Sequence, residues 1–146
     1  MIGELESEIV RANETEHPDI IIVEGQGALS HPAYASSAGI LKGARPQAVI
    51  LQHAPKRKVL GDFPFFPVPS VESEIQLIEH YGKTKVIGIT LNHEGMNDLE
   101  IEKTIKEYEL KYQLPTTDIL KQGAGKIIDQ IIQFFPSLQG KKLKGA

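Results

Sequence analysis

Cysteine is absent from this chain of 146 residues, and its absence excludes several kinds of chemistry at once. The protein has no disulfide framework, no thiolate metal site and no cysteine nucleophile. An excess of positive charge is also missing, because the formal net charge is −3 at pH 7, which argues against a general nucleic-acid-binding protein. No apolar run approaches the roughly 20 residues that span a bilayer, and the acidic N-terminus does not resemble a signal peptide. We expect a cytoplasmic protein that binds neither nucleic acid nor membrane.

A phosphate-binding loop of the Gly-x-x-x-x-Gly-Lys-Ser/Thr type is missing as well. The nearest fragment is Gly123-Ala124-Gly125-Lys126-Ile127. It lacks the upstream glycine spacing and the hydroxyl that binds magnesium. The sequence therefore predicts that this chain has no phosphate cradle of its own.

Three short apolar runs stand out at residues 20–23, 48–51 and 86–91. Their β-branched residues do not alternate with polar ones, which is typical of strands covered on both faces. Helical patterns lie between them, and strands alternating with helices favour a parallel sheet. We predict an α/β fold, a three-layer α/β/α arrangement with a mainly parallel sheet. Residues 1–138 are expected to form a single domain, followed by a basic flexible tail at 139–146.

The helices and one loop can be placed from local signals. A proline-rich stretch, residues 63–69, is predicted to be a loop, because proline cannot supply ladder donors. Its aromatic side chains are expected to seal the sheet edge, and the alternative is that they cover a pocket. Residues 113–118 are predicted to form a short connection or a fourth strand. Apolar spacing and capping residues predict four helices: one at the N-terminus containing Leu5 and Ile9, one after Ser70, a longer one capped by Asp98, and one near 125–135 that ends at Pro136.

The loop after the first apolar run carries the richest chemistry. Glu24 ends that run and is followed by Gly25, Gln26 and Gly27, then by Ser30 and His31. A third glycine is missing at position 30, so this is no dinucleotide fingerprint. A carboxylate at the end of a buried strand needs a partner, so Glu24 is a candidate ligand of hydrated Mg²⁺ or a base that holds a substrate amine. The alternative is that Glu24 only shapes the turn, and His31 before proline has the same alternative.

The other predicted strands also end in polar residues. His53 follows the second strand, and Arg57 lies in a basic cluster that could hold phosphate through its planar donors, or could simply be solvated. Asn92 follows the third strand, where its amide could recognise a base or merely form a turn. Asp118 is a candidate ligand-binding residue, although N-capping of the final helix explains it equally well. Parallel strands would bring these residues to one edge of the sheet.

Several strings together resemble a known family. Val23 to Tyr34 (Val-Glu-Gly-Gln-Gly-Ala-Leu-Ser-His-Pro-Ala-Tyr), then Gln52-His53 and Ile87 to Asn92, are similar to the C-terminal part of a domain-of-unknown-function family that includes bacterial D-glutamate N-acetyltransferases. The resemblance runs from about residue 8 to residue 135. It implies a P-loop, dethiobiotin-synthetase-like fold. It also implies that Glu24, Gly25 and Gly27 help to bind magnesium and substrate, and that Asn92 meets a base.

The resemblance also implies what this chain lacks. The family's N-terminal domain and its phosphate loop would lie upstream of Met1, so the chain resembles the C-terminal half of a family member. A sheet without its phosphate-loop strand would expose an apolar edge. We therefore expect a homo-oligomer, or a pairing with a chain that carries the phosphate loop.

Three functions follow as hypotheses. The first is part of an N-acyltransferase that acts on a small amino acid of the D-glutamate type with acetyl-CoA and is incomplete alone. The second is half of an ATP- and Mg²⁺-dependent ligase that binds a nucleotide, and the third is a non-catalytic assembly or regulatory domain. For the first, histidine is suited to remove a proton near neutral pH. The candidate catalytic residues are Glu24, His31 and His53, and the candidate binding residues are Gly25, Gln26, Gly27, Ser30, Arg57, Asn92 and Asp118.

Overall fold

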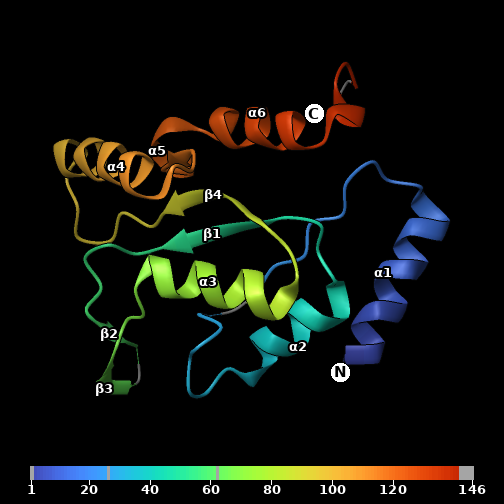
Figure 1. Cartoon of the computed structure of the whole chain (residues 1–146), viewed down its shortest axis with the longest axis horizontal. Coiled ribbons are helices and arrows are strands. Elements are labelled where there is room, and N and C mark those ends of the chain that lie inside the picture. Colours follow the sequence, from blue (N-terminus) through green and yellow to red (C-terminus); the bar gives the residue numbers. More distant parts are fainter. Residues whose placement is uncertain (1, 26, 62, 142–146) are drawn as a thin grey trace. The chain divides into compact units, whose positions relative to one another are not determined.

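The computed structural model describes residues 2–25, 27–61 and 63–141 (Figure 1). The chain divides into two compact units. The first unit consists of Met1–Val49 and Arg57–Val86, and the second of Ile50–Lys56 and Ile87–Ala146. The expected domain boundary at residue 138 stays a prediction.

The second unit is built on a sheet with the strand order β1-β4-β5. Strand β1 is Val49–His53, β4 is Val86–Leu91 and β5 is Thr116–Thr117, and the first residues of β1 and β4 are assigned to the first unit. Strands β4 and β5 are parallel, and the arrows of β1 and β4 point the same way in Figure 1. All six residues of the central strand β4 are buried. The predicted strands at 48–51 and 86–91, the fourth strand and the parallel α/β sheet are therefore confirmed.

Three helices belong to the same unit: α4 (Asp98–Tyr112), the short α5 (Ile119–Gln122) and α6 (Gly125–Phe134). Both α4 and α6 contact β5, and Pro136 opens a 3₁₀ turn, η1 (Pro136–Leu138), just after α6 ends. The helix predicted to begin with Asp98 as its cap is instead capped by Asn97. Asn97 and Glu100 form a capping box, because each side chain accepts from the other's backbone N–H.

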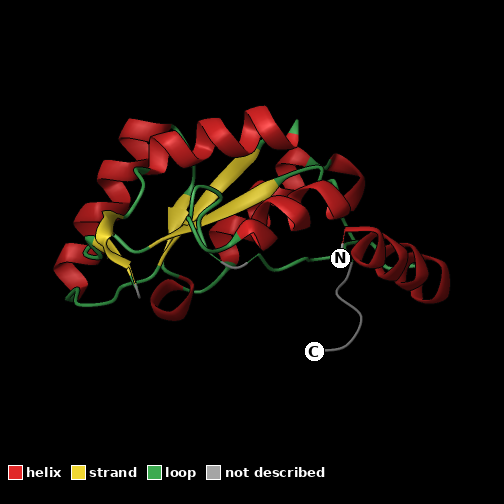
Figure 2. Cartoon of the chain, turned by 90° about the horizontal axis from the view of Figure 1, so that it is seen from below, coloured by secondary structure: helices red, strands yellow, loops and turns green. Residues whose placement is uncertain are grey.

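The first unit contains α1 (Ile2–Glu16), α2 (Ala35–Ala44) and α3 (Val71–Gly82). Figure 2 shows the helices of the chain in red and its strands in yellow. Helices α1 and α2 pack closely enough that a Cβ added at Gly43 would lie 2.9 Å from the carbonyl oxygen of Ile2. Ser70 caps α3 as predicted, because its Oγ accepts the backbone N–H of Ser73 at 3.1 Å.

The proline-rich stretch forms a strand, so the loop predicted there is wrong. Strand β3 (Phe63–Pro67) pairs antiparallel with β2 (Val59–Leu60) in a two-stranded sheet. Prolines are tolerated in β3 because each strand of such a pair has one unpaired side, where no N–H is required. Phe65 is 92% exposed, so its ring does not seal a sheet edge.

The first apolar run is also not what the sequence predicted. Residues 20–23 form no strand, and Ile22 is 88% exposed. Within the part of the chain that the structure describes, neither sheet includes this segment. A β-branched run becomes a buried strand only when a neighbouring strand satisfies its backbone groups, and composition does not reveal whether that neighbour exists.

None of the described helices is both long enough and apolar enough to cross a membrane.

Candidate functional site

Polar residues from three strands gather at the carboxyl edge of the second unit's sheet. His53 ends β1, Asn92 and His93 follow β4, and Asp118 follows β5. The backbone N–H of Asn92 donates to the carbonyl of His53 at 2.8 Å, which brings the ends of β1 and β4 together. The structure thus brings together three residues proposed from the sequence, His53, Asn92 and Asp118. Ligands of open parallel sheets bind at this edge.

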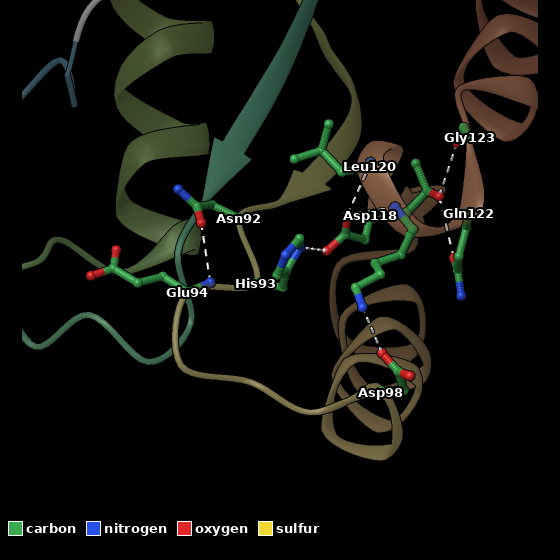
Figure 3. Close-up of polar contacts among 10 residues, drawn as sticks. Asn92, His93, Glu94, Asp98, Asp118, Leu120, Gln122 and Gly123 are labelled. Carbon is green, nitrogen blue, oxygen red and sulfur yellow. Dashed lines mark hydrogen bonds and ion pairs between the residues drawn. The ribbon is translucent and has the colours of Figure 1, made fainter.

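The side chains of His93 and Asp118 are in hydrogen-bond contact at this edge (Figure 3). The Nδ1 atom of His93 lies 2.6 Å from Oδ2 of Asp118. The Asp118 side chain is 1% exposed, whereas that of His93 is 31% exposed. A buried carboxylate therefore holds one nitrogen of an imidazole that solvent can reach.

Asp118 is also the N-cap of a helix. Its Oδ1 accepts the backbone N–H groups of Leu120 at 3.0 Å and Lys121 at 3.2 Å, so it caps the short helix α5 rather than the final helix. The charge of Lys121 is directed elsewhere, because its Nζ binds Asp98. These contacts satisfy a buried carboxylate that would otherwise be costly.

His93 was missed by the sequence reasoning, which singled out its neighbour Asn92. The signal was present, because His93 directly follows the Asn92 position at the end of β4. The Oδ1 of Asn92 accepts the backbone N–H of Glu94 at 3.1 Å, which supports its reading as a turn residue (Figure 3).

His53 is half-buried beside Tyr108. Its Nδ1 lies 2.9 Å from the Tyr108 hydroxyl. Burial lowers the pKa of His53, and burial also raises the pKa of Tyr108 to about 12. The tyrosine therefore stays protonated near neutral pH and can donate to Nδ1, in which case the Nε2 of neutral His53 carries the hydrogen.

We expect His53 to make folding sensitive to mild acid. Because its pKa in the folded state is lowered from 6.5, the unfolded chain binds this proton more readily. The contribution to stability is complete above the unfolded pKa and is lost as pH falls through the folded value. Urea unfolding of wild type and His53→Gln at about pH 7.5 and about pH 5.5 should show the smaller loss in the variant. Tyr108→Phe preserves much of the burial of His53 and should lose as much stability between the two pH values as wild type does. An equal loss in His53→Gln would show that His53 is not the source of the acid sensitivity.

The basic cluster around Arg57, which includes Lys56, already makes contacts with protein groups. Lys56 binds the Glu100 carboxylate, and this contact lowers the pKa of Glu100. Arg57 lies in the first unit, and it already interacts with another group of the protein. A role for Arg57 in phosphate binding stays a prediction.

Lys126, in the fragment that most resembles a phosphate loop, is engaged by protein atoms. Its Nζ lies 2.7 Å from Oε1 of Glu109 and 2.9 Å from the carbonyl oxygen of Thr116. Burial alone would raise the pKa of Glu109, but the contacts from Lys126 and from the Thr116 N–H together lower it. Lys126 of α6 thus joins α4 to β5.

In the first unit, the glycine-rich loop is shaped by Gly27 and Tyr34. Gly27 has φ +68°, and a Cβ added there would lie 2.6 Å from Cδ2 of Tyr34, so both conformation and space require glycine. The His31 ring packs against the Tyr34 ring, with ring centroids 4.2 Å apart and the ring planes tilted by 33°. Its Nδ1 accepts the backbone N–H of Ala33 at 3.1 Å, which matches the turn-residue alternative.

Glu74 anchors this loop and was not anticipated. This residue of α3 is 4% exposed. One carboxylate oxygen accepts the backbone N–H of Leu29 at 2.7 Å, and the other binds the hydroxyl of Ser30. Ser30 therefore has a defined structural partner. Its contact could not be seen in the sequence because 44 residues separate the two side chains.

The remaining proposed residues of this loop are less constrained. Glu24 is exposed and follows no strand, so the premise of a carboxylate ending a buried strand is wrong. Gly25 has open space around its Cα, and Gln26 lies outside the described residues. Within the described ranges, no group of three or more acidic or histidine side chains is arranged to hold a metal ion. Magnesium binding by Glu24 stays a prediction.

Comparisons with known proteins place this chain in a family. Residues 1–128 match the family model described as "Domain of unknown function (DUF1611_C) P-loop domain". The chain is 33% identical to a D-glutamate N-acetyltransferase of Tritonibacter scottomollicae over 125 residues, covering 82% of this chain and 37% of that protein. It is also 33% identical to a D-glutamate N-acetyltransferase of a Pseudoalteromonas species over 132 residues, covering 86% of this chain and 39% of that protein.

A solved structure supports the same assignment. The crystal structure of a DUF1611 family protein from Anabaena variabilis superimposes with a TM-score of 0.83 at 27% identity, covering 90% of this chain and 40% of that one. The chain thus spans about two fifths of the length of these relatives. The match over most of its residues shows that it belongs to the DUF1611 family, within the C-terminal P-loop domain of that family.

Proposed function

We propose that this chain forms part of an N-acyltransferase that acts on the amine of a small amino acid of the D-glutamate type. The names of two relatives support the reaction class. The observation that carries the proposal is the presence of His53 and His93 at the carboxyl edge of a parallel sheet. N-acyl transfer needs a group that accepts a proton from an ammonium near neutral pH, and histidine is the side chain best suited to do so.

The described residues fit the amino-acid half of this reaction better than the acyl donor. Acetyl-CoA would supply the acyl group, and its phosphates require cationic side chains or backbone N–H groups. Lys56 and Lys126 are already bonded to Glu100 and Glu109. We therefore propose that the binding of the donor depends on residues outside this chain, and that the chain alone transfers acetyl groups poorly.

Isothermal titration calorimetry tests the reaction class. We expect D-glutamate to bind without magnesium, and acetyl-CoA to bind only weakly because residues outside this chain are proposed to hold it. Magnesium-dependent binding of ATP, with no binding of either of those ligands, would overturn the proposal in favour of a ligase-type function. The absence of any binding would favour a non-catalytic domain. A parallel assay of acetyl transfer should give little product, and full turnover by this chain alone would refute its incompleteness.

We also propose that the exposed run at residues 20–23 is covered by another polypeptide, either a second copy or a chain that carries a phosphate loop. Ile20, Ile21 and Ile22 are 48%, 38% and 88% exposed, which is unusual for three adjacent β-branched residues. Static light scattering is expected to show a mass above that of the monomer. A monodisperse monomer would count against self-association, and co-purification experiments with a phosphate-loop chain would then decide the remaining alternative.

A further inference from the structure

His93 differs from His53 and His31 in the chemical partner of its ring. The Nδ1 of His93 faces a carboxylate, the Nδ1 of His53 faces a phenol and the Nδ1 of His31 faces a backbone N–H. A carboxylate only accepts hydrogen bonds, so Nδ1 of His93 must carry a hydrogen. In neutral His93 the lone pair then resides on Nε2. The same reasoning gives His31 the opposite tautomer, because its Nδ1 accepts.

The setting of Asp118 fixes this tautomer firmly. Its side chain is 1% exposed, and its other oxygen is held by the N–H groups of Leu120 and Lys121. The carboxylate therefore cannot turn away from His93 without losing the cap of α5. The His93 side chain, by contrast, is 31% exposed, so a ligand can approach its ring from solvent.

We propose that His93 is the general base of this chain and that Asp118 is its positioning residue. This inference rests on the proposed N-acyl transfer. The Nε2 lone pair takes a proton from the substrate ammonium, so that one N–H bond breaks and a bond from Nε2 to hydrogen forms. The freed amine lone pair then bonds to the acyl carbon of a thioester as the C–S bond breaks. The leaving thiolate takes up the proton that the new amide nitrogen loses, and the imidazolium returns its own proton to water. The imidazolium carries one positive charge, which the Asp118 carboxylate neutralises. His53 does not serve in this way when Tyr108 donates to its Nδ1.

The tautomer provides the first test, and it requires no substrate. In a ¹H–¹⁵N spectrum of the imidazole groups, wild-type His93 should show a protonated Nδ1 and an unprotonated Nε2 at a pH where the ring is neutral. Asp118→Asn keeps an oxygen to cap α5, since asparagine is as good an N-cap as aspartate, but turns an NH₂ donor toward Nδ1. The hydrogen of neutral His93 should then move to Nε2. An Nε2–H tautomer in the wild type, or no change in Asp118→Asn with α5 intact, would overturn the inference.

Reactivity provides the second test. The probe is p-nitrophenyl acetate, a small ester whose bond to p-nitrophenolate breaks as its acetyl carbon bonds to Nε2, after which water releases acetate. We expect the rate above that of an equal concentration of free imidazole to fall by about 10²-fold or more in His93→Gln and in Asp118→Asn. Neither variant offers a free Nε2 lone pair, and this is the scale on which a positioned histidine contributes to a rate. His80→Gln is the matched control, because it removes an exposed histidine of α3 that has no proposed role, and it should retain the wild-type rate. Equal rates in all four proteins would overturn the assignment of His93.

Addition of D-glutamate separates this inference from the function on which it rests. Slower His93-dependent hydrolysis in its presence would support both. If D-glutamate has no effect while the tautomer and the His93 dependence are as expected, the base is established and the proposed substrate is wrong. If D-glutamate binds by calorimetry but His93→Gln hydrolyses the ester like wild type, the proposed substrate stands and the base is wrong.

Discussion

Replacing Glu74 with alanine should lower the free energy of unfolding by about 2–3 kcal/mol. The Glu74 carboxylate is 4% exposed and holds both the Leu29 N–H and the Ser30 hydroxyl. Hydrogen bonds to a charged group contribute about 1.5–3 kcal/mol each, and the loss is partly offset because alanine removes a buried charge and Ser30 can turn to water. Urea unfolding measures the difference, and hydrogen exchange at the Leu29 amide reports directly on release of the loop.

Two variants make this expectation specific. In Glu74→Gln the amide oxygen can accept from Leu29 while the NH₂ group donates to Ser30, so the loss should stay below about 1 kcal/mol. Ser30→Ala leaves one carboxylate oxygen without its partner and should cost about 1 kcal/mol while Leu29 stays protected. If Glu74→Ala is as stable as wild type and its Leu29 amide exchanges no faster, the carboxylate does not anchor the loop.

The sequence predicted two groups of functional residues, one in the loop from residue 24 to 31 and one at the ends of the strands, and the structure supports their placement unequally. The sequence identified the loop from residue 24 to 31 as the chemical centre, yet the contacts observed there hold the loop in place: Gly27 against Tyr34, His31 against Ala33, and Ser30 against Glu74. The Ser30 contact depends on a partner in a distant segment, and the Gly27 conformation depends on a positive φ, neither of which residue type alone reveals. The His31 contact is local and matches the turn alternative weighed from the sequence. The strand-end rule succeeded for His53, Asn92 and Asp118, because parallel pairing fixes which end of each strand lies at the edge.

The same rule could not rank the residues at that edge. Asn92 and His93 are adjacent, and only the position of β5 shows that His93 is the one opposite Asp118. The sequence alone does not show that residues 93 and 118 lie close together, because the whole of helix α4 separates them along the chain. Asp118 was judged equally suited to binding and to N-capping, and the structure shows that one carboxylate caps α5 with Oδ1 and meets His93 with Oδ2. A carboxylate with two oxygens can therefore cap a helix and contact a second side chain at the same time, and ligand binding by Asp118 stays a prediction.

Two apolar runs that look alike in sequence should differ strongly in how much stability a substitution to alanine removes. Ile89 lies in the central strand β4 and is 0% exposed, whereas Ile22 is 88% exposed. Ile89→Ala should lower the free energy of unfolding by about 3–5 kcal/mol, because it removes buried methylene groups and leaves a cavity. Ile22→Ala should change it by less than about 0.5 kcal/mol, the usual range for a surface substitution. Urea unfolding at one protein concentration compares the two directly.

The more conservative Ile89→Val should cost about 1 kcal/mol, which separates a cavity from a general loss of β propensity, since valine keeps the branched Cβ. The Ile22→Ala result also bears on the proposed covering of residues 20–23. In a purified monomer this substitution should be neutral, whereas in an associated state that buries Ile22 it should weaken association and make the loss depend on protein concentration. A loss above about 2 kcal/mol that does not vary with concentration would mean that Ile22 is buried within the chain itself, as the sequence first predicted.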